Sequence, residues 1–300
     1  MNVEKLIRAT AARLEAAGVF FGHGTDNAFD EAAELVFFAL GLVHEDAERA
    51  YRQQVTQAHT ERVESLVSRR IAERVPAAYL THRMWFGGLE FYVDERVLVP
   101  RSPIAELIEA QFRPWIDPER VRTVLDIGTG SACIAIATAM AFPQAMVDAA
   151  DVSADALSVA NINIERHALS ARVRAVASDV FSGIGERRYD IIVSNPPYVS
   201  DAEMAALPQE YGREPALGLR AGRDGLDVAR RILAGAREHL QDGGILVLEV
   251  GDSEYALQSA FPNVPFTWLE FERGGGGVLV LTSEQLSAHA DDLSRTYEKQ

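Results

Sequence analysis

A polar segment directly after an apolar run places the strongest constraint on the fold of this chain. The run 189–194 is rich in β-branched residues, and Asn195, Pro196, Pro197 and Tyr198 follow it at once. Proline fixes φ and cannot donate to a strand ladder, so the strand must end here with Asn195 held extended. In open α/β sheets, ligands bind beyond the carboxyl ends of parallel strands. We therefore expect a functional site at these four residues, which we call the tip.

The chemistry of the tip suits a planar amine. The side-chain oxygen of Asn195 can accept one hydrogen of an –NH₂ group, and the carbonyl of Pro196 can accept the other. Tyr198 offers a flat apolar wall for a planar group. A simple strand terminator would use the same residue types, because Asn and Pro dominate turns for local reasons.

The segment 124–136 is typical of a strand, a glycine-rich loop and the start of a helix. Gly128 and Gly130 lie in the loop, and Asp126 ends the strand. A dinucleotide site would need another glycine at Cys133, and an acid beside the loop would repel pyrophosphate. S-adenosylmethionine fits better, because it has a cationic amino-acid end and no pyrophosphate.

Two further predicted strands also end in acids. Asp151 follows the strand 145–150 at the offset where an acid reaches ribose hydroxyls. Asp179 follows the strand 172–177 and could accept a hydrogen bond from the adenine amine. Three carboxylates at three strand ends favour a cofactor site over surface acids. The predicted cofactor-binding residues are Asp126, Ile127, Gly128, Thr129, Gly130, Asp151, Val152, Asp179, Val180 and Asn195.

The glycine-rich loop followed by Asn-Pro-Pro-Tyr resembles the signature of the glutamine-amide methyltransferases that act on translation proteins. The resemblance covers nearly the whole chain and includes the segments 97–106 and 214–226. In the release-factor branch the first of these looks like Pro-Arg-Pro-Asp-Thr-Glu, whereas Arg101 is followed here by Ser102. At this position, and in the segment 20–30, the sequence is similar to the branch that methylates the third protein of the large ribosomal subunit.

This resemblance implies a Rossmann-like α/β fold with a mostly parallel seven-stranded sheet, S-adenosylmethionine as cofactor, and a glutamine amide nitrogen as acceptor. It implies that the tip is catalytic and binds the acceptor, and that Arg101 also binds substrate. The third glycine usual in the loop is Ala132 here, which is small enough for close helix packing.

A carboxamide nitrogen is a weak nucleophile, because its lone pair is delocalised. Its hydrogens become stronger donors as it attacks, so acceptors at Asn195 and Pro196 would bind the transition state better than the ground state. Alignment matters more here than a strong base, so we assign no general base. The histidines lack metal-ligand spacing, so no metal site is expected, and His23 and His167 are expected in surface or capping roles.

Periodicity divides the chain into three expected domains. Residues 1–83 have amphipathic helical patterns and are interpreted as a substrate-docking domain, with a purely structural cap as the alternative. Residues 84–98 form a β-hairpin linker that turns at Gly87 and Gly88. Residues 99–300 alternate strands with helices and form the methyltransferase domain. Helices are expected at 3–17, 28–40, 60–74 and 102–115, a closing antiparallel pair at 266–271 and 277–282, and a frayed helix in the polar tail from Ser283.

The charge of the chain favours a basic protein partner. It has 29 basic and 44 acidic residues and a formal net charge of −15. Such a charge opposes binding along a nucleic-acid backbone and would speed encounter with a basic ribosomal protein. On charge alone, an acidic surface that only keeps the chain soluble explains it equally well. Arg213, Arg220 and Arg223, in the loop 199–224, are expected to fold that loop against acids.

The single cysteine, Cys133, excludes an internal disulfide and is expected to pack as a small residue in the first turn of a helix. It fits a reducing cytosol. Because neither a signal-peptide pattern nor a bilayer-length apolar stretch is found, we expect a soluble cytoplasmic protein.

Three other functions stay open. The release-factor branch is separated only by resemblance around Ser102. Enzymes that methylate exocyclic amines in nucleic acid use a related tip, but residues 1–84 carry 10 basic and 12 acidic side chains and not a basic cleft. A non-catalytic ribosome assembly factor could also retain the fold.

Overall fold

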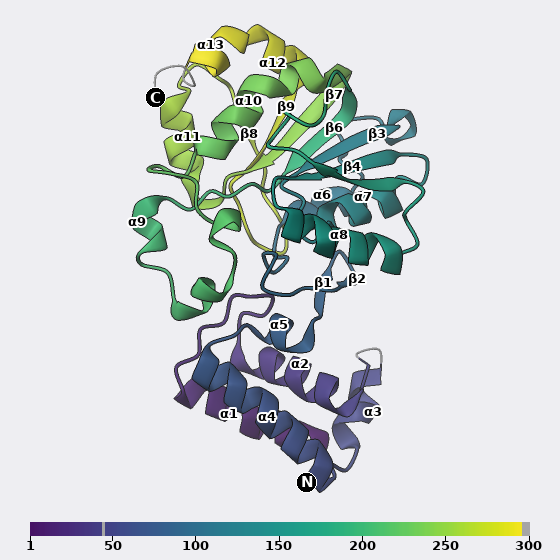
Figure 1. The fold of residues 1–300 in the computed structure, drawn as a ribbon, viewed down its shortest axis with the longest axis vertical. Helices are drawn as coiled ribbons and strands as arrows, with labels where there is room; N and C mark the ends of the chain where they lie inside the picture. The colour runs from purple at the N-terminus through teal and green to yellow at the C-terminus, as the bar shows by residue number, and fades with distance from the viewer. Residues whose placement is uncertain (44–45, 296–300) are drawn as a thin grey trace.

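The computed structural model describes residues 1–43 and 46–295. Figure 1 shows a helical part made by the N-terminal segment and a larger part built around a sheet. The chain begins at the outer end of the helical part. The loop 199–224 leaves the sheet part and reaches down to the helical part.

The helical part forms because its amphipathic segments bury one shared apolar cluster, which includes Leu14, Val36 and Val67. Asn27 caps the second helix through its side chain, and Thr56 begins the fourth with a capping box. The three predicted helices are present within a few residues of their expected ends. The helices are α1 (Val3–Ala16), α2 (Ala28–Leu40), α3 (Ala47–Arg52), α4 (Gln57–Glu73) and α5 (Ala77–Thr81).

A hairpin follows the helical part, as the glycine pair predicts. Strands β1 (Met84–Phe86) and β2 (Leu89–Phe91) pair antiparallel, with Phe86 opposite Leu89. Phe86 and Phe91 are buried in the apolar layer beside the sheet. The hairpin is therefore fastened to the sheet part.

The prediction of a mostly parallel seven-stranded sheet is confirmed. The strand order is β5-β4-β3-β6-β7-β9-β8. The strands from β5 to β7 are parallel, and β9 runs antiparallel to β7 on one side and to β8 on the other. The chain moves outward from β3 to β5 and then returns to the other side of β3, so the order switches between β3 and β6. The strands are β3 (Thr123–Ile127), β4 (Met146–Asp151), β5 (Val173–Ala177), β6 (Tyr189–Ser194), β7 (Leu240–Glu249), β8 (Thr267–Trp268) and β9 (Val278–Thr282).

Helices cover both faces of the sheet, which explains why its central strands are apolar on both sides. One apolar layer lies under α6 (Ile104–Glu109), α7 (Cys133–Ala141) and α8 (Ala154–Arg166). Cys133 is buried in it, as expected of a packing residue. The other layer lies under α10 (Asp227–His239), α11 (Glu254–Ala260), α12 (Ser283–Ala288) and α13 (Ala290–Arg295). The loop 199–224 contains α9 (Asp201–Met204) and the 3-10 turns η3 (Gln209–Arg213) and η4 (Ala216–Gly218).

Two sequence-based expectations were wrong in detail. The helix expected over 102–115 ends at Glu109, because the chain turns through left-handed residues to bury Phe112 against Phe142. The strand expected over 266–271 keeps only two residues. The helix expected in the tail from Ser283 is present as α12 and α13, and Leu286 and Leu293 are buried in the core. The fraying expected at the end of the tail falls on residues 296–300, which lie outside the described chain.

Candidate functional site

The tip lies at the switch point of the sheet. Ile127 pairs with Ser194, so the glycine-rich loop after β3 and the tip after β6 leave the sheet side by side. A Cβ built on Gly128 would lie 3.8 Å from the Asn195 carbonyl oxygen. Within the described residues, neither the Asn195 side chain nor the Pro196 carbonyl takes part in a hydrogen bond. The tip therefore presents two free acceptors.

A first cavity of about 380 Å³ opens beside these acceptors. Its lining combines the ends of β3, β4, β5 and β6 with the loop 199–224. The structure therefore brings most of the predicted cofactor residues to one place. Those that line the first cavity are Ile127, Gly128, Gly130, Asp151, Val152, Asp179, Val180 and Asn195.

Asp151 is fixed by the backbone around it. Its Oδ2 accepts the Gly130 N–H at 2.9 Å, and its Oδ1 accepts the Ser153 N–H at 2.9 Å. Burial raises the pKa of this carboxyl, although those N–H bonds oppose the shift. Each oxygen keeps a lone pair, so Asp151 can still accept from a ligand hydroxyl.

The far wall of the first cavity combines charge with exposed apolar surface. Asp179 is exposed and pairs with Arg231 at 2.7 Å, and that guanidinium lowers the pKa of Asp179. Val152 is 56% exposed although it is apolar. Val180 has a φ of 54°, a conformation that β-branched residues rarely adopt and that often marks functional sites.

Asp126 and Thr129 were also predicted to bind the cofactor, but neither of them lines the first cavity. Asp126 is 1% exposed and lies beneath the loop, where its Oδ2 accepts from the Thr129 hydroxyl at 2.6 Å and the Ala135 N–H at 3.1 Å. Its Oδ1 is buried with no hydrogen-bond partner in the described chain. Burial raises the pKa of Asp126 to about 7. The acid therefore holds the loop in shape from beneath.

A second cavity, of about 650 Å³, lies on the other side of the tip. Tyr198 and Arg101 line it, so the tip borders both cavities. Glu249, Asp252 and Glu254 also line the second cavity and give it an excess of negative charge.

Arg101 does not project freely toward a substrate. Its guanidinium forms a bidentate pair with Glu214, with both N–O distances 2.7 Å, and stacks over the Tyr211 ring. Burial would raise the pKa of Glu214, but the pairing with His23 and Arg101 outweighs it and lowers the pKa to about 2. Arg101 therefore holds the loop 199–224 against the segment before α6, and the predicted substrate contact has no support in this geometry.

The two singled-out histidines have different roles. His23 is 3% exposed, so the expected surface role was wrong: its ring packs on Tyr211, with Nε2 3.5 Å from Glu214 Oε2. His167 is the C-cap residue of α8, which confirms the expected capping role, and its Nε2 lies 2.9 Å from the Glu90 carbonyl oxygen.

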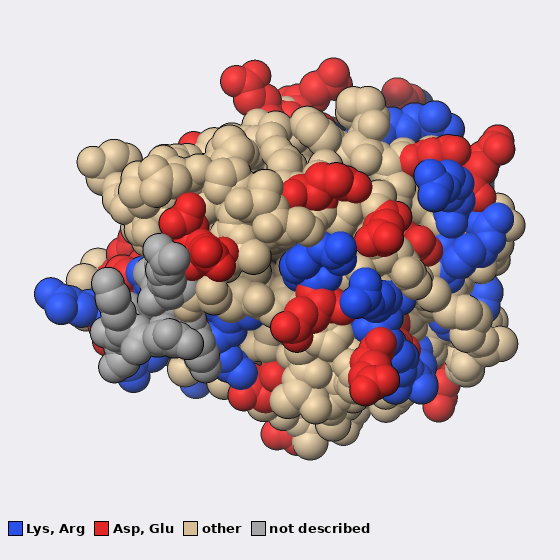
Figure 2. Space-filling view, turned by 90° about the horizontal axis from the view of Figure 1, so that it is seen from above, with Lys and Arg blue, Asp and Glu red and all other residues tan. Residues whose placement is uncertain are grey.

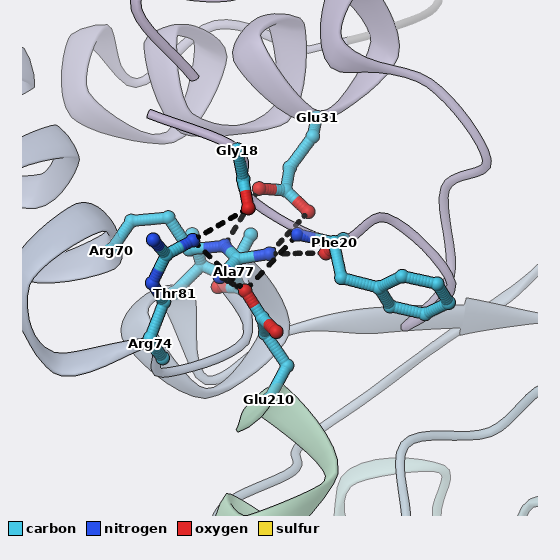
Figure 3. A network of polar contacts seen from close by, with 8 residues as sticks. All are labelled: Gly18, Phe20, Glu31, Arg70, Arg74, Ala77, Thr81 and Glu210. Atoms are coloured by element: carbon cyan, nitrogen blue, oxygen red, sulfur yellow. Dashed lines mark hydrogen bonds and ion pairs between the residues drawn. The ribbon is translucent and has the colours of Figure 1, made fainter. Parts of the chain in front are cut away.

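The loop 199–224 is anchored in the helical part by a buried acid. Figure 3 shows Glu210 of η3 pointing up between the helices toward Arg70 and Arg74. Its Oε1 lies 3.4 Å from a nitrogen of each arginine and accepts the Phe20 N–H at 3.0 Å. Arg70 is fully buried and also donates to Glu31 at 2.7 Å. The network ties three separate chain segments together.

The loop arginines only partly meet expectation. Arg220 pairs with Asp201 at 2.6 Å and folds the loop on itself. In the described part of the chain, no ion pair is found for Arg213 or Arg223.

Comparison with known proteins identifies the family. The methyltransferase small domain family matches residues 112–210. A ribosomal protein uL3 glutamine methyltransferase from Xylella fastidiosa is 52% identical over 98% of this chain and 94% of the relative. One of the same name from Francisella tularensis is 43% identical over 99% of this chain and 95% of the relative. The chain belongs to the ribosomal protein uL3 glutamine methyltransferase family. The resemblance seen in the sequence is confirmed.

The solved structures agree on the fold of this family member. The crystal structure of the hMettl16 catalytic domain in complex with the MAT2A 3′UTR hairpin 1 superposes with a TM-score of 0.53 and 17% identity, covering 85% of this chain and 92% of that one. At this identity the likeness shows the Rossmann-like methyltransferase fold alone. Among the described residues, no helix is long and apolar enough to cross a membrane.

Sequence reasoning missed three site residues of this methyltransferase. Glu249 ends β7, so the strand-end rule that singled out Asp151 also applied to it. Glu214 and Ser102 lie within the two segments that carried the family resemblance, but no local pattern assigned either one a partner. Their partners are 113 and 147 residues away in the chain.

Proposed function

We propose that this chain transfers the methyl group of S-adenosylmethionine to the side-chain amide nitrogen of a glutamine in ribosomal protein uL3. The observation that carries the proposal is the pair of free acceptors at Asn195 and Pro196, beside a cavity that suits this cofactor. Family membership supports the choice of acceptor, since the relatives are named for uL3.

The first cavity fits S-adenosylmethionine. A Cβ on Gly130 would meet no atom within 4 Å, so the glycine leaves space where a ligand can approach the backbone. Asp151 would accept from the ribose hydroxyls, and Asp179 from the adenine amine. Val152 and Val180 offer apolar surface to the adenine faces. When bound, the cofactor supplies an electrophilic methyl group.

The tip holds the acceptor nitrogen and stabilises its developing charge. Asn195 Oδ1 would accept one amide N–H and the Pro196 carbonyl the other, which turns the nitrogen lone pair toward the first cavity. As the new N–C bond forms, positive charge grows on the nitrogen and both hydrogen bonds strengthen. The S–CH₃ bond of the cofactor would break as the N–C bond forms, which would leave the neutral thioether S-adenosylhomocysteine. The methylated nitrogen would then release one N–H proton to solvent water, and the product is an N-methylated amide.

The acceptor protein would approach from the second cavity, on the Tyr198 side of the tip. Three carboxylates line that cavity, and the one arginine among its lining residues is already paired with Glu214. Figure 2 shows the face over the C-terminal helices, where acidic and basic side chains alternate and no single charge dominates. The acidic second cavity is therefore the better match for a basic ribosomal protein. Such an acceptor would place the enzyme in the cytoplasm.

One experiment tests the proposal. The protein is incubated with methyl-labelled S-adenosylmethionine and, separately, with free uL3, a release factor and duplex DNA, and the label is located by mass spectrometry. We expect label on one glutamine of uL3. Label confined to the release factor or to DNA would replace the proposed acceptor, and no label on any of them would contradict the proposal.

A further inference from the structure

Tyr198 sits in a tightly built socket. Its carbonyl accepts the Ser253 hydroxyl at 3.0 Å. A Cβ on Gly225 would lie 2.3 Å from that same carbonyl oxygen, and a Cβ on Gly251 would lie 2.6 Å from the Tyr198 ring. Such distances leave no room for a side chain at either glycine, so both backbone and ring of Tyr198 are fixed from outside the tip.

Glu249 holds the hydroxyl group of Tyr198. Ser194 pairs with Leu248, so Glu249 ends its strand directly beside Asn195, the first residue of the tip. The Tyr198 hydroxyl donates to Glu249 Oε1 at 3.2 Å. Glu249 is 3% exposed, and both residues line the second cavity.

Ser102 directs the other oxygen of this carboxyl. Its hydroxyl oxygen accepts the Ile104 N–H at 3.2 Å, and its hydrogen is donated to Glu249 Oε2 at 2.5 Å. A hydroxyl has one hydrogen, so accepting from the backbone leaves that hydrogen for Glu249. Each carboxylate oxygen of Glu249 thus receives one committed donor.

We infer that Glu249 and Ser102 are positioning residues, which fix Tyr198 as the wall against which the acceptor amide is held. This inference rests on the proposed function and assigns a role to residues outside the tip. Both act through Tyr198 and not by contact with the methyl group. Their loss should therefore lower kcat and leave the affinity for S-adenosylmethionine unchanged, because neither lines the first cavity.

The charge state of Glu249 gives this role a pH signature. Burial raises the pKa of Glu249 to about 7, although the hydrogen bonds from Ser102 and Tyr198 and the charge of Arg101 oppose the shift. Asp252 is the other charged group near the Tyr198 hydroxyl. The ionised carboxylate accepts from both hydroxyls, whereas protonation turns one oxygen into a donor. The hydroxyl that faces this oxygen must then accept instead of donate, so its orientation changes.

The test is the pH dependence of kcat for methylation of free uL3 at saturating cofactor. The wild-type kcat should rise as pH increases through about 7 and then level off. Glu249→Gln should lose this rise and run about tenfold slower at pH 8, with an unchanged cofactor Kd by calorimetry. An unchanged inflection in Glu249→Gln would overturn the inference.

A second experiment tests whether Ser102 acts through Glu249. Ser102→Ala should lower kcat severalfold, and adding it to Glu249→Gln should cost little more, because the two share one interaction. Ser283→Ala is the matched control: Ser283 is also buried and accepts a backbone N–H, but it lies in α12, away from the site. If the double variant lost kcat by the product of the two single-variant factors, Ser102 would not act through Glu249.

Failure of this inference and failure of the proposed function give different results. If wild-type protein labels no uL3 glutamine, the proposed function fails. If it labels uL3 and the Glu249→Gln and Ser102→Ala variants match the wild type in kcat and pH profile, only the positioning role fails. Thermal unfolding of each variant shows whether a loss of kcat merely reflects unfolding.

Discussion

The acids at the ends of neighbouring strands differ in how deeply they are buried and in which groups they contact. Asp151 faces the first cavity with its oxygens oriented by backbone N–H groups, whereas Asp126 lies under the loop with a raised pKa. Asp179 stays exposed and paired with Arg231. The sequence predicts all three as strand-end acids, but it does not show how deeply each side chain is buried. Only the packed structure separates an acid that lines the cavity from one that is buried beneath the loop.

Asp151→Ala should act through cofactor binding. Removing a charged acceptor of ribose hydroxyls costs about 1.5–3 kcal/mol, so we expect the Kd for S-adenosylmethionine to rise roughly 10- to 100-fold. Isothermal calorimetry measures this directly. Asp155→Ala, an acid in the first turn of α8 outside the first cavity, is the control and should bind normally. An unchanged Kd for Asp151→Ala would remove its assigned role.

Asp126 should make folding stability depend on pH. Its folded pKa of about 7 lies above the ordinary value of 3.8, so the folded state binds more protons between those values. Its stabilising contribution is thus complete below pH 3.8 and is lost as pH rises toward 7. Relative to Asp126→Asn, the wild-type free energy of unfolding should fall on the order of 1–4 kcal/mol from pH 4 to 8. The measurement is urea titration at several pH values. The same pH dependence of the unfolding free energy in both proteins would contradict the prediction.

Among the elements, the segments after strands decide where the site residues point. Periodicity predicts the strands and long helices, because one buried face repeats along each of them. It does not predict η5 (Gly251–Ser253), the short turn after β7 that closes the Tyr198 socket. The conformation of such a turn depends on contacts between segments that are distant in the sequence, such as Gly251 and the Tyr198 ring. No local sequence pattern predicts a contact of this kind.

Gly251→Ala should impair catalysis by displacing the Tyr198 ring. We expect kcat to fall about tenfold or more, corresponding to at least about 1.4 kcal/mol, with cofactor affinity unchanged. Gly243→Ala is the matched control, because Gly243 also has a positive φ of 74° but its Cβ would meet nothing within 4 Å. Steady-state kinetics on uL3 distinguish them. Equal losses of kcat in the two variants would show that backbone strain, and not the ring contact, is responsible.

For the molecule as a whole, the loop 199–224 connects the helical part with the tip. Glu210 joins it to α4, and Glu214 joins it to Arg101 ahead of α6. The sequence predicts an α/β part and a helical part but not this connection, because the paired residues are more than 100 positions apart. We propose that the helices dock the acceptor protein and that this loop keeps them in register with the tip.

Glu210→Gln should loosen that connection. Removing one charge from a buried network costs roughly 1–3 kcal/mol of folding stability. Among the described residues, it leaves Glu31 as the carboxylate paired with Arg70. Hydrogen exchange in residues 199–224 should quicken, and the KM for uL3 should rise severalfold with little change in cofactor Kd. Glu203→Gln, in the exposed capping box of α9, is the control. Unchanged exchange and KM in Glu210→Gln would show that the network does not couple the two parts.

The tip is tested most directly by the rate of methyl transfer to uL3 in Asn195→Ala, measured in single turnover at saturating labelled cofactor. Removing one acceptor that strengthens in the transition state should slow transfer about 10²–10³-fold, while the cofactor Kd changes less than tenfold. The exposed Asn161→Ala variant on α8 should match the wild type. A wild-type transfer rate in Asn195→Ala would contradict the account that this side chain holds the acceptor amide.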